Sequence, residues 1–338
     1  MKIAITGASG NVGTALLRRL STDGDADIVG ISRRPPPRIE PYASAEWRAI
    51  DISKPSCEQQ LREAFRGVDA VVHAAWAIQP SHDRGLLRAT NQGGSRAVAT
   101  AARDVGVRHL VHMSSVGTYA AAPGQWKDES WPAAGVATSS YSVDKAACEA
   151  MLDGITDLLI TRVRPALILQ PAAASEISRY FIGNLVPVTL LRPKFLRLAP
   201  LPRQVAVQFV HAEDVADAVV RILRTQSGGA FNLAADPILD RDEFAAIFGG
   251  VGPPAPPALL RTMAELTWRV RLQPTDAGWI DLGLSVPLMT TARARDSLGW
   301  RPRHTLPDIL RTFVDALQRG AGAAGPVLYP RKRRPGER

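Results

Sequence analysis

Short apolar runs alternate with stretches of helical periodicity along most of the chain. Buried strands of a parallel sheet appear as continuous apolar runs, whereas surface helices repeat apolar residues every three or four positions. These patterns predict strands at residues 3–5, 28–31, 47–52, 68–73, 108–113, 158–164, 205–210 and 230–233. They predict helices at residues 57–65, 83–105, 139–152, 176–191, 212–223, 259–272, 291–298 and 306–317, with a first helix that begins at Val12. The alternation predicts an α/β fold in which helices cover both faces of a doubly wound parallel sheet.

A glycine-rich turn joins the first strand to the first helix. Gly7, Gly10 and Gly13 are spaced three apart, as G-x-x-G-x-x-G. A helix N-terminus offers free N–H groups and the positive end of its dipole to a phosphate, and glycines leave room for the approach. The spacing is related to the dinucleotide fingerprint G-x-G-x-x-G without matching it. It predicts a nucleotide site, the alternative being a tight connection and nothing more.

The end of the second strand carries Ser32, Arg33 and Arg34. In dinucleotide-binding units an acidic side chain at this place accepts from the 2′-hydroxyl of the ribose, whereas arginine suits a 2′-phosphate. No acid is present here, so the sequence favours NADP(H), with NAD(H) as the second choice. The alternative is that both arginines are solvated loop residues.

A candidate redox site lies after the fifth predicted strand. Tyr141 and Lys145 are four positions apart in a predicted helix, so they share one helix face. A neighbouring ammonium is expected to lower the pKa of a phenol, which is about 10 in water, toward the working range. Ser115 at the end of the strand can donate a hydrogen bond to a substrate carbonyl. Together the three residues predict proton transfer coupled to hydride transfer by a nicotinamide.

With these motifs in order, the chain resembles the extended short-chain dehydrogenases/reductases, often called the NAD-dependent epimerase/dehydratase family, over about residues 1–318. The motifs that carry the resemblance are the glycine turn, Asp51-Ile52, His73-Ala74-Ala75, Asn91, Ser114-Ser115, Tyr141-x-x-x-Lys145, Arg164-Pro165, residues 209–216 and residues 298–302.

The resemblance implies a role for each matching position. Asp51 is expected at the adenine, Ala74 and Ala75 under the cofactor, and Lys145 at the nicotinamide ribose. Ser115 and Tyr141 act on the substrate as the catalytic pair, with Ser114 as the second choice for the serine. The expected cofactor-binding positions are Gly7, Ser9, Gly10, Asn11, Val12, Gly13, Ser32, Arg33, Arg34, Asp51, Ile52, Ala74, Ala75, Trp76, Asn91, Lys145 and Pro165. Asn91 is expected to support the active-site helix.

The resemblance also implies a Rossmann domain interleaved with a smaller, mostly helical substrate domain. The expected dinucleotide-binding domain spans residues 1–165 plus about 205–233. Residues 166–204 plus 234–320 form the substrate domain, in which the pattern is irregular at 193–202 and broken by prolines at 249–257. Residues 321–338 are expected to form a basic, disordered tail. Dimerisation through the helices at 83–105 and 139–152 is common in the family, and a homodimer is therefore an expectation here.

Two departures from the family bear on the substrate. Members that act on nucleotide sugars carry an asparagine after the sixth strand and an arginine before the aromatic-Val-His segment. Here these places hold Leu167 and the run 206–208, so a less anionic, non-nucleotide substrate is favoured. The expected substrate-binding residues are Trp76, Ser115, Trp126, Tyr141 and Leu167. The loop residues Trp76, Trp126 and Trp131 either rim the pocket or pack loops onto the body, and Trp268, Trp279 and Trp300 are assigned to the core.

Composition excludes several other classes of function. The net charge is +9, but the last eight residues contribute four of these charges, which favours a solvated tail over a polyanion-binding arm. Cys57 and Cys148 form no CxxC pair and no metal motif, and no apolar run is long enough to span a bilayer. We therefore predict a cytoplasmic protein with no metal, no nucleic-acid partner and no membrane span. The histidines at 73, 109, 112 and 211 are assigned structural or capping roles.

Three functions remain open from the sequence. The leading hypothesis is an NAD(P)-dependent oxidoreductase that interconverts a carbonyl and an alcohol on a small non-nucleotide metabolite, with Tyr141 as general acid and base. The alternative is a nucleotide-sugar epimerase or dehydratase that uses the same tyrosine. A third hypothesis is a non-catalytic NADP-sensing protein.

Overall fold

Seven parallel strands form the central sheet of the computed structural model, which describes residues 1–79, 81–182, 191–273 and 275–330. Their order is β10-β7-β5-β4-β1-β2-β3. The strands are β1 (Lys2–Thr6), β2 (Asp27–Ser32), β3 (Ala45–Ala49), β4 (Ala70–His73), β5 (His109–Met113), β7 (Leu159–Pro165) and β10 (Gly229–Leu233). The reversal of strand order between β1 and β4 is the place where ligands bind in doubly wound folds. The predicted α/β class and parallel sheet are confirmed.

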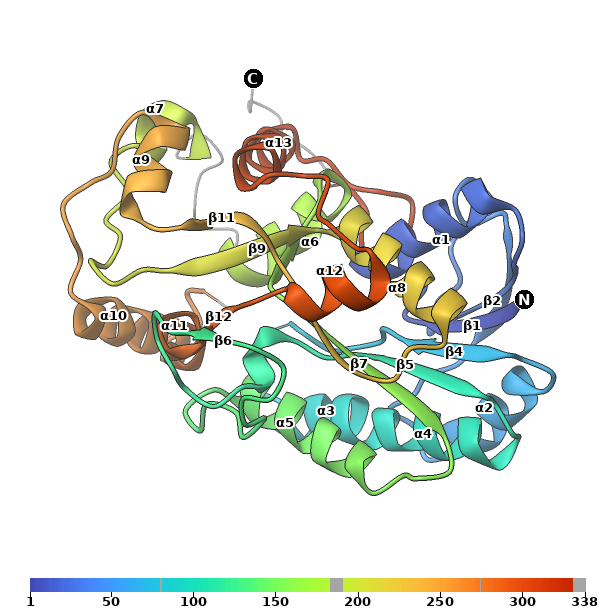
Figure 1. Cartoon of the computed structure of the whole chain (residues 1–338). Helices are drawn as coiled ribbons and strands as arrows, with labels where there is room; N and C mark the ends of the chain where they lie inside the picture. Colours follow the sequence, from blue (N-terminus) through green and yellow to red (C-terminus); the bar gives the residue numbers. More distant parts are fainter. Residues whose placement is uncertain (80, 183–190, 274, 331–338) are drawn as a thin grey trace.

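Helices cover both faces of this sheet (Figure 1). One face carries α1 (Asn11–Asp23), α8 (Ala212–Thr225) and α12 (Ala292–Leu298), and the other carries α2 (Cys57–Phe65), α4 (Gly94–Asp104) and α5 (Ser140–Asp153). Successive side chains of a strand point to opposite faces, so Ile3 and Ile5 belong to the first hydrophobic core and Ala4 to the second. Both layers are apolar because every central strand is buried on two sides.

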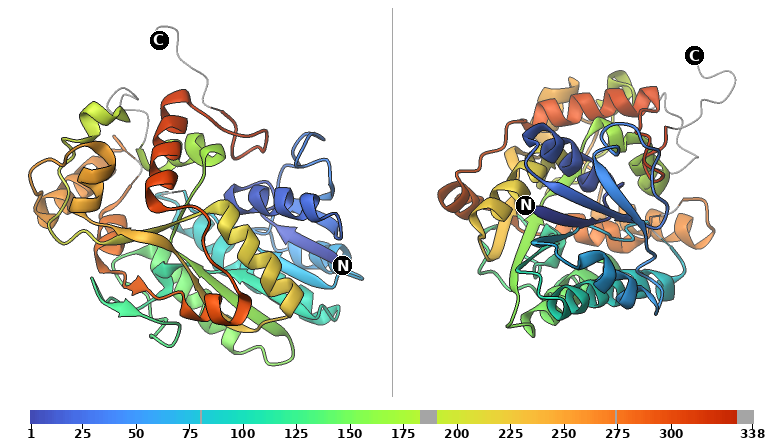
Figure 2. Two further views of the ribbon diagram at one scale, coloured as in Figure 1. Left: turned by 45° about the horizontal axis from the view of Figure 1, so that its top comes forward. Right: turned by 90° about the vertical axis from the view of Figure 1, so that its right-hand side faces the viewer.

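A second, three-stranded sheet is built from β8 (Leu167–Leu169), β9 (Val207–His211) and β11 (Ala235–Leu239). A third hydrophobic core joins it to α6 (Ala174–Ile177), α9 (Arg241–Phe248) and α13 (Leu306–Arg319). In the views of Figure 2, α13 lies on the same side of the molecule as α1. The sequence assigns residues 205–233 to the dinucleotide domain; within them β10 joins the central sheet, whereas β9 pairs with β8 and β11 and places Phe209 in the third core and Val210 in the first. The division into two domains otherwise remains a prediction.

Several element boundaries differ from the prediction. The third strand ends at Ala49, so Asp51 lies in the turn beyond it. The helix predicted at 83–105 consists of α3 (Arg84–Arg88), the wide turn η1 (Ala89–Gly93) and α4. The helix predicted at 176–191 is α6 followed by the wide turn η4 (Ser178–Ile182), and residues 183–190 lie outside the described part of the chain.

The remaining elements of the described chain lie outside the two larger sheets and their main covering helices. They are β6 (Trp126–Lys127), β12 (Leu288–Met289), α7 (Pro193–Leu196), α10 (Pro257–Arg269) and α11 (Ala277–Ser285), with single turns η2 (Val116–Thr118) and η3 (Pro171–Ala173). Helices α10 and α12 match the predicted helices at 259–272 and 291–298. The sequence missed α9, α11 and the short strands, because their apolar patterns are too brief to show a period.

The segment after α13 differs from the expected disordered tail. Residues 321–330 fold back on the body, with the Ala323 N–H donating to the Leu328 carbonyl at 2.8 Å. The Leu328 side chain is completely buried, and the Gly325 N–H donates to the Tyr42 hydroxyl at 3.1 Å. Burial of the apolar Leu328 side chain holds residues 321–330 against the body, which the basic composition of residues 321–338 does not indicate. The basic residues 331–338 lie outside the described part of the chain.

Two statements about composition can be compared with the structure. Cys57 and Cys148 are both buried and free, as the absence of a paired motif predicts. Within the described residues, every helix is too short or too polar to cross a bilayer.

Candidate active site

The glycine turn is the tightest part of the expected cofactor site. Gly7 has φ +71°, and a Cβ there would lie 2.7 Å from the Cα of Ala75. A Cβ at Gly13 would lie 2.3 Å from the Gly7 carbonyl oxygen. Gly10 is the N-cap of α1 and provides no side-chain cap. The first-turn N–H groups of α1 therefore remain available to an anion, and the glycines let the turn lie against the end of β4.

Asn11 connects this turn to the second sheet. Its Nδ2 donates to the Ile168 carbonyl at 3.3 Å, and its Oδ1 accepts from Gln170 Nε2 at 2.8 Å. The side chain is thus used within the fold, which leaves the backbone N–H for a phosphate. Ser9 is buried, and Val12 packs against the first core.

The end of β2 combines a buried hydroxyl with two exposed cations. Ser32 Oγ is buried and has no hydrogen-bond partner within the described residues, while Arg33 and Arg34 are exposed. Asp51 Oδ1 accepts from the N–H and hydroxyl of Ser53 at 3.1 and 2.7 Å. Burial opposes ionisation of Asp51, but these bonds and the charge of Arg33 outweigh it and lower its pKa. Asp51 is therefore a carboxylate at neutral pH.

The loop after β4 is fixed by Asn91. Its Oδ1 accepts from the Ala77 N–H at 2.8 Å, and its Nδ2 donates to the Ala77 carbonyl at 3.2 Å. Its own carbonyl accepts a weak bond from Cys148 on α5 at 3.5 Å. Asn91 thus holds the loop that carries Ala74, Ala75 and Trp76 against the helix of the expected active site.

Ile52 differs from the other expected cofactor residues. Its side chain is buried in the second core, where it approaches Gly94 so closely that a Cβ on Gly94 would lie 2.7 Å from Ile52 Cδ1. The side chain of Ile52 therefore packs between β3 and α4. Pro165 is buried at the end of β7, and Leu167 follows it on β8 with 44% of its surface exposed.

Tyr141 lies among aromatic rings drawn from three parts of the chain. Its ring centroid is 6.0 Å from Trp76, edge to face, and 5.0 Å from Trp279 on α11. Phe181 packs edge to face on the other side of Trp279 at 4.9 Å. Ser115 lies close enough to the phenol for its hydroxyl to favour a lower pKa of Tyr141. The structure thus brings Ser115, Tyr141 and Trp76 together, and their roles in a site stay predictions.

Gly117 makes this arrangement possible. A Cβ at this position would lie 3.0 Å from Tyr141 Cε1 and 3.4 Å from Ser115 Oγ. Sequence reasoning missed Gly117, although its place two residues after the candidate serine was a usable signal.

The electrostatics of Tyr141 and Lys145 differ from the prediction. Burial raises the pKa of Tyr141 to about 12, against the lowering effect of Ser115. Burial lowers the pKa of Lys145 to about 7, against the opposite effect of Cys148 and Glu149. Lys145 Nζ donates to the Met113 carbonyl at 2.7 Å and lies 3.5 Å from the centre of the Trp76 ring. The expected lowering of the tyrosine pKa by lysine is therefore wrong, because Lys145 itself is a weak cation held by other groups.

A buried ion pair between Arg164 and Glu149 lies next to the candidate site, where it contacts Ser114. Arg164 on β7 donates through Nε to Glu149 Oε1 at 2.9 Å and through a second nitrogen to Glu149 Oε2. Ser114 donates to the same carboxylate at 2.5 Å, and Arg164 also donates to the Tyr119 hydroxyl at 3.0 Å. Ser114 is thus committed to this network, which leaves Ser115 as the serine that faces the phenol.

Some of the tryptophans pack in the core, and others lie near Tyr141 or at the surface. Trp300 is buried and donates to the Asp214 carbonyl, as expected for a core residue. The sequence also assigns Trp279 to the core, but its half-buried ring contacts Tyr141, so that assignment is incomplete. Trp131 packs against the first core and donates to the Ala120 carbonyl. Trp126 is 52% exposed on β6, and among the described residues it makes no aromatic contact with Tyr141.

His73 and His109 are buried with hydrogen-bond partners, whereas buried His112 has none at either ring nitrogen within the described residues. His73 bonds to Thr6 at 2.7 Å and to Ser95 at 2.9 Å, and burial lowers its pKa to about 3. His109 bonds to Thr161 at 2.7 Å. These contacts agree with the structural roles assigned from the sequence.

These observations together test whether the described residues fit a nicotinamide dinucleotide. Ser32 Oγ and Trp76 Nε1 are buried polar atoms without partners in the described chain, at the two ends of the expected cofactor path. The glycine cradle that a Cβ would fill lies between them. Buried polar atoms are normally satisfied, so the residues present fit such a group.

Comparison with known proteins agrees with this geometry. A model of the NAD dependent epimerase/dehydratase family matches residues 3–234. A UDP-glucose 4-epimerase of Thermus thermophilus, solved in complex with NAD, has a TM-score of 0.67 at 20% identity, covering 94% of this chain and 99% of the other. At that identity the likeness shows the fold.

Curated relatives cover different shares of the chain. An uncharacterized protein of Mycobacterium tuberculosis is 26% identical over 94% of this chain, which spans only 30% of that relative's length. A UDP-glucose 4-epimerase of Mycolicibacterium smegmatis is 28% identical, covering 93% of this chain and 98% of the relative. A ceramide reductase of Caulobacter vibrioides is 27% identical, covering 69% and 64%.

Proposed function

This chain belongs to the NAD dependent epimerase/dehydratase family, and within it we propose a nicotinamide-dependent reductase of a carbonyl on a small, non-nucleotide metabolite. The observation that carries the proposal is the half-buried Tyr141 phenol, which lies beside Ser115 and contacts the rings of Trp76 and Trp279. A bound nicotinamide supplies or accepts the hydride. Because its pKa is raised, Tyr141 is protonated at neutral pH, which is the state that donates a proton to a carbonyl oxygen. Ser115 orients that oxygen.

The proposed substrate is apolar or aromatic near the reacting carbonyl. Trp76 and Trp279 flank the phenol, and exposed Leu167 stands where nucleotide-sugar enzymes carry asparagine. Gln208, in the segment that lacks the arginine, is buried and exchanges hydrogen bonds with the Met289 backbone at 2.6 and 3.2 Å. These two described positions thus lack the asparagine and the arginine that nucleotide-sugar enzymes carry there, which favours a substrate without a diphosphate.

The preferred cofactor in this proposal is NADP(H). Arg33 and Arg34 are exposed at the end of β2 beside the unpartnered Ser32 hydroxyl, where a 2′-phosphate would accept from all three. Arg33→Ala is expected to weaken NADPH at least about tenfold more than NADH, as the loss of a charge-assisted bond implies. Fluorescence titration of both cofactors measures this, and an equal loss for both would remove the case for NADP(H).

A second candidate function is the epimerisation of a nucleotide sugar. It is favoured by the relative from Mycolicibacterium smegmatis, which matches nearly the whole chain. The two functions differ in stoichiometry, since a reductase consumes external cofactor and an epimerase regenerates it. The test is NADPH and NADH oxidation with a panel of aromatic and aliphatic aldehydes and ketones, alongside conversion of UDP-glucose. Conversion of the sugar without net cofactor use would overturn the reductase proposal.

Assembly and location remain expectations. A homodimer through α4 and α5, the interleaved domain boundaries and a cytoplasmic location follow from the resemblance and the composition.

A further inference from the structure

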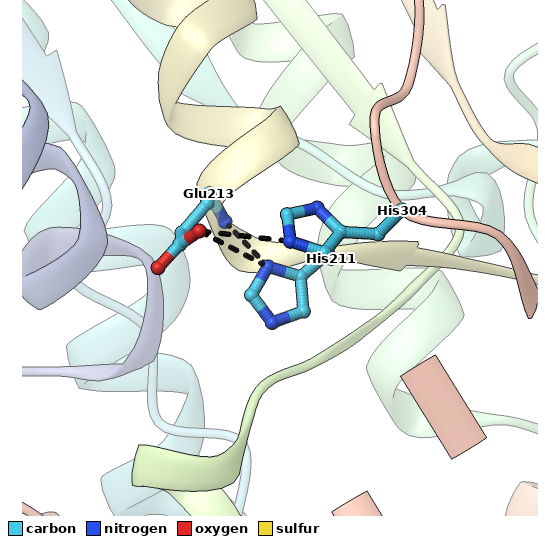
Figure 3. A group of neighbouring side chains, drawn as sticks. All are labelled: His211, Glu213 and His304. Carbon is cyan, nitrogen blue, oxygen red and sulfur yellow. Dashed lines mark hydrogen bonds and ion pairs between the residues drawn. The ribbon is translucent and has the colours of Figure 1, made fainter. Parts of the chain in front are cut away.

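Three side chains from two distant segments meet at the start of α8 (Figure 3). His211 ends β9 and caps α8, Glu213 lies in the first turn of α8, and His304 precedes the N-cap Thr305 of α13. The two imidazole rings are stacked with centroids 3.9 Å apart. One nitrogen of each ring faces Glu213 Oε2, His211 Nδ1 at 3.9 Å and His304 Nε2 at 3.7 Å.

Neighbouring groups define the tautomer of each ring. A carboxylate can only accept, so His304 Nδ1, 3.0 Å from Asp214 Oδ2, carries a proton, and in the neutral imidazole the lone pair is then on Nε2. His211 Nδ1 accepts from the Glu213 N–H at 3.3 Å, so its lone pair also lies on the nitrogen that faces Glu213. Two imidazole nitrogens and one carboxylate oxygen thus lie within 4.8 Å of one another, and the Nδ1 lone pair of His211 is engaged by the Glu213 N–H.

The distances from Glu213 Oε2 to the two imidazole nitrogens are too long for direct hydrogen bonds but short enough for a shared metal ion. Distances of 3.7 and 3.9 Å are too long for N–H···O bonds, which span about 2.7–3.2 Å. Ligands held at about 2.0–2.2 Å from a shared metal ion lie roughly 3.4 Å apart in tetrahedral geometry and can lie no more than about 4.3 Å apart. The observed spacing is within reach of a shared ion once the two stacked rings turn so that both ring planes contain its position.

We propose that His211, Glu213 and His304 bind a divalent transition-metal cation of the Zn²⁺ class through two imidazole nitrogens and one carboxylate oxygen. The site stands apart from Tyr141 and does not depend on the proposed reaction. Imidazole with carboxylate is a donor set that suits zinc rather than magnesium or calcium. The Asp214–His304 bond is the carboxylate–histidine pairing that orients imidazole ligands in metal sites.

The surrounding charges permit this occupant. The positive end of the α8 dipole opposes a cation, but Glu213 and Asp214 in the first turn outweigh it. Arg18 lies 3.8 Å from Glu213 Oε1, the oxygen that faces away from the histidines, and Arg303 lies 3.6 Å from Asp214. Oε2 of Glu213 therefore remains free of a cationic partner in the described chain.

A metal here would link α8, which packs on the central sheet, to the loop that leads into α13 of the third core. His211 would exchange its capping bond for the metal, and His304 would hold the start of α13 to α8. The expected role is structural, with stability rising as the metal binds the native state alone.

The test uses the untagged full-length protein after removal of metals with a chelator. Zn²⁺ is added alone, and binding is followed by isothermal calorimetry and by the thermal midpoint of unfolding. We expect one Zn²⁺ per chain, a higher midpoint, and affinity reduced at least about tenfold in both His304→Gln and Glu213→Gln. His82→Gln is the matched control, because His82 contacts the Trp268 ring at a centroid distance of 4.1 Å and lies in another part of the fold.

Three outcomes would overturn the proposal. Zn²⁺ fails to bind the wild-type protein, or His304→Gln and Glu213→Gln bind it as tightly as wild type does, or His82→Gln loses it equally. Loss of binding in both variants with full binding in His82→Gln supports the site.

Discussion

The buried carboxylate of Glu149 offers the sharpest test of how the candidate site is held in place. Glu149 and Arg164 are only 2% and 5% exposed, and the carboxylate accepts both guanidinium bonds as well as the Ser114 hydroxyl. Glu149→Gln keeps the shape and one acceptor oxygen but removes the charge. Arg164 is then left as a buried cation without its counterion.

The expected loss in the free energy of unfolding follows from the unpaired charge of Arg164. Removing one partner of a buried ion pair costs about 3–5 kcal/mol, because the remaining charge stays desolvated. Native domains have a free energy of unfolding of about 5–15 kcal/mol, so the single substitution removes a large share of it. Arg164→Met in the Glu149→Gln background deletes the stranded charge while Ser114 keeps an acceptor. The double variant is therefore expected to regain most of the loss.

Equilibrium unfolding in urea at pH 7 measures these differences. The expected result is a loss of about 3 kcal/mol or more for Glu149→Gln and a non-additive double variant that lies closer to wild type. A loss below about 1 kcal/mol in the single variant, or a double variant less stable than either single one, would refute the reasoning.

Two further predictions concern a buried acid and a close packing contact. Burial raises the pKa of the Glu176 carboxyl from 4.5 to about 7, against the opposite effect of Arg179. Proton binding to Glu176 therefore stabilises the native state. This contribution is fully present below pH 4.5 and is lost as the pH rises through 7. Glu176→Gln should therefore match wild type near pH 4.5 and exceed it at pH 8 by about 3 kcal/mol in urea unfolding, and an equal difference at both pH values would contradict this. Gly117→Ala should lower kcat roughly tenfold with an unchanged cofactor Kd, because the new Cβ lies 3.0 Å from Tyr141 Cε1. Gly283→Ala, whose Cβ meets nothing within 4 Å, is the control, and equal kcat values in the two variants would remove the packing argument.

The sequence predicted the features that local patterns encode. Short apolar strands and the glycine turn identify the parallel sheet, because each signal lies within a few consecutive residues. The sequence places Trp76 and Ser115 after neighbouring strands and Tyr141 on the helix that follows. Because the carboxyl ends of parallel strands meet at one edge of the sheet, the three residues are expected to lie close together. These inferences needed no knowledge of long-range packing.

What the sequence could not predict depends on contacts between distant segments. Trp279 reaches Tyr141 from a helix in the last fifth of the chain, and the apolar pattern of that helix has no feature that distinguishes a core face from a site face. The pKa of Tyr141 was predicted in the wrong direction, because burial depends on all the surrounding rings and a motif shows only the lysine. The meeting of His211 with His304 is likewise visible only in the folded chain.

Tyr141→Phe tests the proposed function most directly. With NADPH and a carbonyl substrate found in the panel, single-turnover hydride transfer should fall at least about 100-fold, while the Kd for NADPH stays within a few-fold of wild type. Ser115→Ala should show the same pattern to a smaller degree. A Tyr141→Phe enzyme that transfers hydride within a few-fold of the wild-type rate would contradict the assignment of Tyr141 as the proton donor.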